Sequence, residues 1–97
     1  MKKVEQFYNK NQFRIYGEGE NSLQSYDSLV VNIRLDNYNK QIITLGRDWD
    51  YSNTTRKHVY LFLDNYTNIN LYGVENKRKY VNELIENGTL QYNENMF

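Results

Sequence analysis

Residues 29–36 place the strongest constraint on the fold, because their apolar side chains recur at every second position. Alternation with a period of two predicts a β-strand that turns one face toward a core. The opposite face of this segment is mostly polar, which is typical of an antiparallel sheet covered on one side only. We therefore expect an antiparallel sheet whose core face includes Leu29, Val31, Ile33 and Leu35.

Two segments of similar pattern flank this strand. Residues 12–16 alternate and predict a strand before it, and residues 41–45 predict a strand after it. The loop that leads from the central strand to residues 41–45 spans residues 36–40. It is rich in asparagine and aspartate, which tolerate left-handed backbone conformations. These three segments therefore predict a small sheet in which neighbouring strands are joined by hairpins.

The N-terminal region has a less regular pattern. Val4 and Phe7 are three positions apart, which predicts a single helical turn over residues 2–8 that docks both side chains on the core. Residues 17–21 contain two glycines and predict a turn, since glycine adopts positive φ at little cost. Neither segment is expected to add a strand.

Helical patterns follow the strands. Ser52 and Asn53 are both favourable N-cap residues, so a first helix is expected to begin after one of them and to stop near Asn65. A second helix is predicted over residues 74–87, with Glu75 in its first turn, where the helix dipole favours an anion. The buried stripes of the two helices should contain Thr55, Val59, Phe62 and Leu63, and Tyr80, Val81, Leu84 and Ile85.

The order of elements, strands first and helices afterwards, predicts an α+β fold. We expect a three- to four-stranded antiparallel sheet with two helices packed on one face. Gly88 suits the position after the second helix, where Leu90 can close over it, and residues 91–97 would add a short edge strand or fray. A length of 97 residues predicts one domain over residues 1–97.

Composition excludes several kinds of chemistry. The chain has no cysteine, which rules out disulfides and thiolate metal sites. Basic and acidic residues balance at 12 each, which removes the simplest argument for a nucleic-acid-binding domain but leaves room for a local basic patch. The longest apolar run, residues 59–63, is too short to span a membrane, and the polar residues after Lys3 do not suit a signal peptide. We therefore expect a cytoplasmic protein.

Two stretches carry a recognisable motif. Residues 24–28 read QSYDS, and residues 44–63 read TLGRDWDYSNTTRKHVYLFL, around the only tryptophan. With these stretches the chain resembles small uncharacterised proteins of phages, plasmids and low-GC bacteria, in which the first stretch forms a strand. The resemblance covers roughly residues 24–63. It implies an origin in a mobile genetic element, and it carries no assigned activity.

Most of the motif has a structural interpretation. Hydroxyl and acidic side chains at the strand-to-helix junction can satisfy free N–H groups of the first helical turn, and Trp49 can wedge between sheet and helix. Asp48, Asp50 and His58 would be the members of any metal site or acid–base pair, but no recognised catalytic spacing joins them. We expect no catalysis, no metal and no cofactor, with His58 solvated or in a capping role.

The same region offers a binding surface. Arg47, Arg56 and Lys57 cluster around the expected helix start. Tyr51 and Tyr60 lie in the same stretch and would serve as aromatic anchors. Arginine and tyrosine are over-represented among interface hot spots, and basic residues with aromatic rings could also grip single-stranded nucleic acid. The chain has 10 tyrosines and abundant asparagine, a composition that reflects either AT-rich codons or an interaction surface.

These observations lead to one main hypothesis and two alternatives. We expect a small non-enzymatic binding protein of a phage or mobile element, with an inhibitor of a host defence protein, anti-CRISPR-like, as the more concrete form. Its partner would be a protein of the host or of a competing element, such as a defence nuclease complex. The alternatives are a nucleic-acid-binding accessory protein and a homo-oligomeric structural component. The sequence does not fix the oligomeric state.

Overall fold

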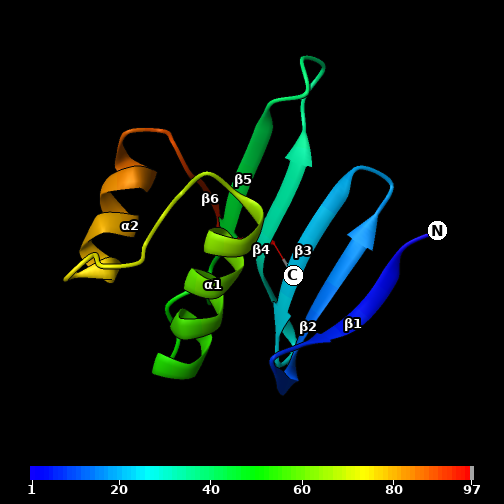
Figure 1. Cartoon of the computed structure of the whole chain (residues 1–97), viewed down its shortest axis with the longest axis horizontal. Helices are drawn as coiled ribbons and strands as arrows, with labels where there is room; N and C mark the ends of the chain where they lie inside the picture. Colours follow the sequence, from blue (N-terminus) through cyan, green and yellow to red (C-terminus); the bar gives the residue numbers. More distant parts are fainter. Residues whose placement is uncertain (97) are drawn as a thin grey trace.

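A computed structural model describes residues 1–96 of the chain as a six-stranded sheet with two helices packed against it (Figure 1). The expected α+β class is therefore confirmed. The elements follow one another as β1 (Lys3–Phe7), β2 (Asn9–Gly17), β3 (Glu20–Ser25), β4 (Ser28–Leu35), β5 (Gln41–Gly46), α1 (Asn53–Tyr66), α2 (Lys77–Glu86) and β6 (Gln91–Asn93).

The sheet has the strand order β1-β2-β3-β4-β5-β6. Strands β1 to β5 form an antiparallel meander, and β6 pairs with β5 in parallel after the two helices. The expected strands at residues 12–16 and 41–45 lie within β2 and β5, and the strand expected at residues 29–36 is β4 except for its last residue. The expected edge strand is confirmed as β6, whereas Phe97 lies outside the described residues.

One N-terminal expectation was wrong, and another was correct only in part. The segment predicted as a helical turn is β1, which pairs along β2 from Lys3↔Tyr16 to Phe7↔Asn9. Val4 therefore points away from the core and is 64% exposed, while Phe7 is buried. The expected turn is present but shorter: only Glu18 and Gly19 turn the chain, because Gly17 ends β2 and pairs with Glu20, the first residue of β3. β3 pairs with both β2 and β4.

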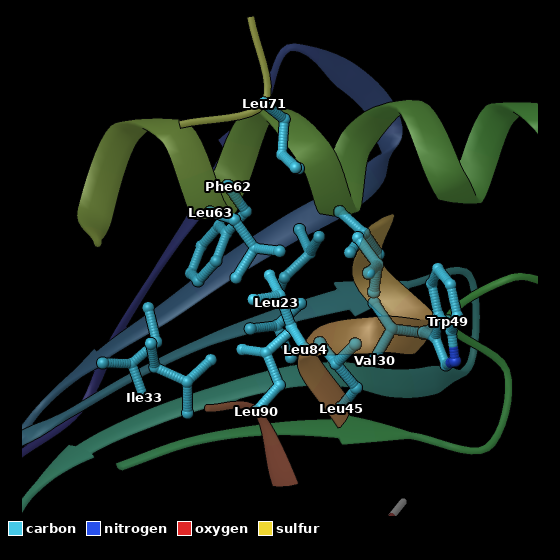
Figure 2. Packing of buried hydrophobic residues seen from close by; sticks show 14 of the residues in the cluster. Leu23, Val30, Ile33, Leu45, Trp49, Phe62, Leu63, Leu71, Leu84 and Leu90 are labelled. Carbon is cyan, nitrogen blue, oxygen red and sulfur yellow. The ribbon is translucent and has the colours of Figure 1, made fainter. Parts of the chain in front are cut away.

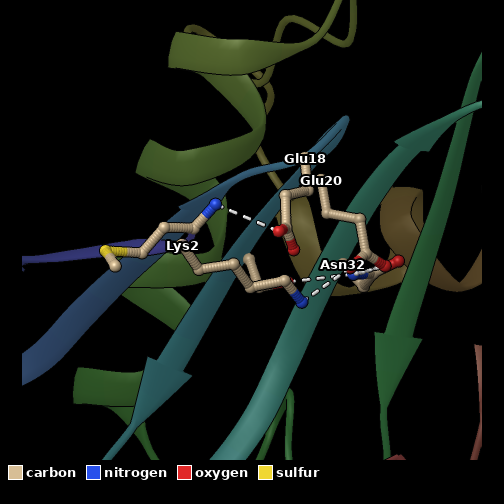
Figure 3. Close-up of polar contacts among 6 residues, drawn as sticks. Lys2, Glu18, Glu20 and Asn32 are labelled. Carbon is tan, nitrogen blue, oxygen red and sulfur yellow. Dashed lines mark hydrogen bonds and ion pairs between the residues drawn. The ribbon is translucent and has the colours of Figure 1, made fainter.

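Contacts at the start of the chain attach β1 to its neighbours (Figure 3). The Met1 ammonium lies 3.0 Å from Glu18 Oε1, and Lys2 Nζ lies 2.7 Å from Glu20 Oε2. The hydrogen bond and charge of Glu20 raise the pKa of Lys2, and the hydrogen bond from Lys2 lowers the pKa of Glu20. Asn32 Nδ2 also donates to Glu20, at 3.4 Å, which links this cluster to β4.

The core face of β4 differs from the strict alternation expected. Val31 and Ile33 are buried as predicted, but Leu35 is 50% exposed and Leu29 is only half-buried. A register shift of the β3–β4 pair between Leu23 and Gln24 interrupts the alternation, and Val30 is fully buried beside Val31. Such an irregularity re-aims the side chains of one strand.

Both helices have side-chain caps. Ser52 precedes α1, and its hydroxyl accepts the Thr55 backbone N–H at 3.1 Å. Asn76 caps α2, so this helix begins at Lys77 rather than at residue 74, and Glu75 lies outside it. α1 extends to Tyr66, one residue beyond the expected stop. These N-caps mark where the chain enters the two helices.

The core lies between the sheet and the helices (Figure 2). α1 crosses one face of the sheet, and α2 lies beside α1 toward the β6 edge (Figure 1). The expected helical core residues are confirmed for Val59, Phe62, Leu63, Val81 and Leu84, while Ile85 is partly buried and Tyr80 is exposed. Fully or almost fully buried contributions also come from Leu23, Leu45, Trp49, Leu71 and Leu90.

Candidate functional site

A pocket of about 530 Å³ opens where the β3–β4 turn meets the N-terminal end of α1. Residues 25–28 and Val30 form one side, and five residues between Asp48 and Thr55 form the other. We call it the junction pocket. Its two sides come from the two stretches that carry the sequence motif, so the fold brings these stretches together in space.

A hydroxyl network holds the two sides of the junction pocket together. Ser25 Oγ lies 2.9 Å from Thr55 Oγ1, and both residues are buried. Ser52 Oγ donates to Thr55 Oγ1 at 3.2 Å while it caps the helix. Ser28 Oγ donates to Asp48 Oδ2 at 2.7 Å. The motif hydroxyls therefore fix the pocket shape, and the expected capping role is confirmed for Ser52.

The acidic residues of the motif do not cap α1. Asp48 accepts from the Ser28 hydroxyl, and Asp50 Oδ2 forms an ion pair with Arg78 Nη2 of α2 at 3.0 Å. The first turn of α1 contains no acidic residue. The expectation that these aspartates satisfy its N–H groups was wrong, because they pair with side chains of other elements.

A second recess, the α1–α2 groove, has a volume of about 500 Å³. Six residues along one side of α1 line it, together with Tyr72 and Gly73 of the connecting segment and Lys77 of α2. Its lining holds three cationic side chains and one carboxylate, that of Asp64, and two tyrosine rings. The groove is therefore an aromatic recess with an excess of positive charge.

The structure divides the predicted binding residues between these recesses. Arg56, Lys57 and Tyr60 line the α1–α2 groove together, and Tyr51 lines the junction pocket. Arg47 lines neither recess, and its Nε lies 3.7 Å from Asp48 Oδ1. The five predicted residues therefore do not form one cluster: three share the groove, one lines the junction pocket, and Arg47 lies outside both.

Two further groove residues, Tyr72 and Lys77, were not among the five predicted binding residues. Tyr72 is 89% exposed, which leaves its ring free to contact a partner. Lys77 Nζ donates to the Val74 carbonyl at 3.1 Å, which bends its side chain over the connection. The sequence does show a tyrosine in the segment between the two helices. It does not show how that segment runs, so it does not reveal which side of α1 the tyrosine lies against.

Two groove side chains are partly committed to the fold. Arg56 Nη1 donates to the Asp50 carbonyl at 2.9 Å, and its Nη2 donates to Asn53 Oδ1. Burial raises the pKa of Tyr60, although the nearby guanidinium groups of Arg56 and Arg78 oppose this rise. The Tyr60 hydroxyl therefore stays protonated at neutral pH and offers a hydrogen-bond donor at the groove.

His58 is buried, with 4% of its surface exposed, so the expectation of a solvated or capping histidine was wrong. Its Nδ1 lies 2.7 Å from the Thr54 carbonyl oxygen, and its ring stands 6.4 Å from the ring of Phe7. Within residues 1–96, no three histidine or acidic side chains are grouped so that they could hold a metal ion. The imidazole contributes to the packing of α1 on the β1–β2 corner.

The fold and its recesses define a class of protein: an α+β domain in which a mostly antiparallel sheet carries two helices on one face. Neither helix of residues 1–96 is long and apolar enough to cross a membrane. The sequence model of a family of unknown function, DUF8033, matches residues 1–82, so the chain belongs to this family. No curated protein and no solved structure shows significant similarity to the chain.

Proposed function

We propose that the chain is a non-enzymatic binding protein that holds an acidic segment of a partner protein in the α1–α2 groove. One observation carries the proposal: Lys57, Lys77 and Arg56 meet two tyrosine rings in a single recess. Arginine and tyrosine dominate interface hot spots, and complementary charge steers partners into register. Within this proposal the finer hypothesis is a phage or mobile-element inhibitor of a host defence protein.

A protein partner fits the groove better than a nucleic acid does. The basic character of the groove is local, because its lining also contains Asp64, whose Oδ1 accepts the Leu71 N–H at 2.7 Å. Arg78, which could extend a basic stripe along α2, is paired with Asp50. Nucleic-acid binders commonly present a continuous basic face, whereas the three cationic side chains of the groove share it with a carboxylate.

The test replaces residues that contribute to the groove but not to the fold. Lys57→Glu with Tyr72→Ala changes two exposed side chains, since Arg56 is partly structural. Lys40→Glu with Tyr38→Ala is the matched control, because both positions are exposed on the distant β4–β5 hairpin. Neither pair should shift stability by more than about 1 kcal/mol.

Capture experiments with tagged protein from a bacterial host should recover a partner with the wild type and with the hairpin control. The groove variant should lose that partner by tenfold or more while its melting temperature stays near that of the wild type. Equal capture by the groove variant would place the interface elsewhere. Tight binding of a single-stranded oligonucleotide that weakens steeply with salt would instead support the nucleic-acid alternative.

A further inference from the structure

The junction pocket has the chemistry of a ligand site and is separate from the groove. Its volume of about 530 Å³ lies in the range of small-ligand pockets, roughly 300–1,000 Å³. The lining contains the carboxylates of Asp27 and Asp48 and no cationic side chain. A group that enters it therefore meets acceptors and negative charge.

The two carboxylates are placed differently. Asp48 is oriented by the Ser28 hydroxyl at 2.7 Å, and a third of its side chain is exposed to solvent. Asp27 is exposed at the tip of the β3–β4 turn and forms no ion pair within residues 1–96. A carboxylate accepts hydrogen bonds at both oxygens and donates none, so the pocket favours a ligand rich in N–H donors.

Two tyrosine rings at the pocket favour a planar cation. Tyr26 is 49% exposed and Tyr51 is 80% exposed. A guanidinium group stacks on such rings and also bonds carboxylates bidentately. The chain already shows this pairing elsewhere, because the Arg14 guanidinium lies 3.8 Å from the centre of the Tyr16 ring and 4.5 Å from that of Tyr66.

The N-terminus of α1 carries a partial positive charge, which opposes the negative charge of the carboxylates. The balance of the two indicates whether the pocket favours a cation or an anion. A helix N-terminus is equivalent to roughly half a positive charge. Arg47, outside the lining, forms an ion pair with Asp48 at 3.7 Å, so Asp27 is the lining carboxylate whose charge no ion pair within residues 1–96 offsets. The Thr55 N–H is already satisfied by the Ser52 hydroxyl. An anion would therefore meet more repulsion than attraction in this pocket.

We propose that the junction pocket binds the guanidinium group of an arginine side chain presented by a partner protein. The carboxylates of Asp27 and Asp48 take its N–H groups, and the rings of Tyr26 and Tyr51 cover its faces. The hydroxyl network between Ser25 and Thr55 keeps the two sides at a fixed separation. The proposal does not depend on the groove, and it assigns a role to both stretches of the motif.

The test uses N-acetyl-arginine amide as the probe and amide NMR shifts as the readout. At pH 7 we expect saturable shifts at residues 25–28 and 48–55 with millimolar affinity. N-acetyl-citrulline amide has the same shape without the charge and should bind at least tenfold more weakly. N-acetyl-lysine amide should also bind more weakly, because an ammonium is a point charge that cannot bond two carboxylates in a plane.

Variants of the protein complete the design. Asp27→Asn should weaken arginine binding at least fivefold while leaving the rest of the amide spectrum in place, and Tyr51→Ala should weaken it further. Glu86→Gln, at an exposed position of α2 outside both recesses, is the matched control and should bind as the wild type does. Equal binding of citrulline, tighter binding of acetate, or unchanged binding by Asp27→Asn would each overturn the proposal.

Discussion

Gln12 offers a sharp test of the core. Its side chain is fully buried, and its Nε2 and Oε1 are the only buried side-chain polar atoms of residues 1–96 without a hydrogen-bond partner. It lies opposite Ser25 in the β2–β3 pair, so the two side chains share the face covered by α1. A buried polar group without a partner costs about 1–3 kcal/mol. Methionine has nearly the same length and flexibility and carries no amide.

We therefore expect Gln12→Met to raise the free energy of unfolding by about 1–3 kcal/mol. For a domain of this size each kcal/mol shifts the melting temperature by roughly 4–8 °C. Urea and thermal unfolding can be followed by the fluorescence of Trp49, the only tryptophan, which is 3% exposed in the folded state. Gln91→Met, on the exposed strand β6, is the control and should stay within about 0.5 kcal/mol.

A loss of stability in Gln12→Met would refute this reasoning. It would show that the amide of Gln12 gains more from its surroundings than an apolar side chain of equal length does. Gln12 of β2, Ser25 of β3 and Thr55 of α1 would then act together as a stabilising polar network between the sheet and the helix.

Three further predictions concern the fold. Phe62→Ala should lower the free energy of unfolding by about 3–5 kcal/mol, since the ring is fully buried between those of Phe7 and Tyr66; near-native stability by urea unfolding would disprove this packing. Gly46→Ala should prevent stable folding, because a Cβ there would collide with the Leu29 carbonyl oxygen, and a folded variant by circular dichroism would contradict this. Two backbone N–H groups of the hairpin loop lower the pKa of the Asp36 carboxyl. The contribution of this carboxylate to stability is therefore present above its unfolded-state pKa and is lost as pH falls through its folded-state pKa. The wild type should lose more stability on acidification than Asp36→Asn does. Parallel profiles of stability against pH for the two proteins would exclude this contribution.

Part of the fold was predictable because its signals are local. The alternation in β2, β4 and β5 and the helical stripe with Ser52 at its start depend on neighbours within a few residues. Most of β3 was missed because Leu23 is its only apolar residue. The QSYDS stretch, which the resemblance gave as a strand, is instead the end of β3, the turn at Tyr26 and Asp27, and the first residue of β4. β1 was misread because it lies at the sheet edge, where Val4 is exposed and no alternation is required.

The site was predictable in composition but not in arrangement. Both motif stretches were singled out from the sequence, but their contact through Ser25 and Thr55 depends on β3 pairing with β4, which the sequence pattern did not show. Tyr72 reaches the groove only because the segment between the helices folds back along α1. Contacts between distant segments depend on the whole topology, so periodicity along the chain does not reveal them.

The parallel pairing of β6 with β5 has a consequence for how the chain folds. Every other strand pair joins sequence neighbours, whereas Gly46 pairs with Asn93 across both helices. Closing a loop of this length costs about 3 kcal/mol of chain entropy. β6 has only three residues, all exposed, so burial of Leu90, roughly 1.5–3 kcal/mol, must supply much of the compensation. We expect the meander to form first and β6 to dock last, which makes the C-terminal edge the first part of the native sheet to open.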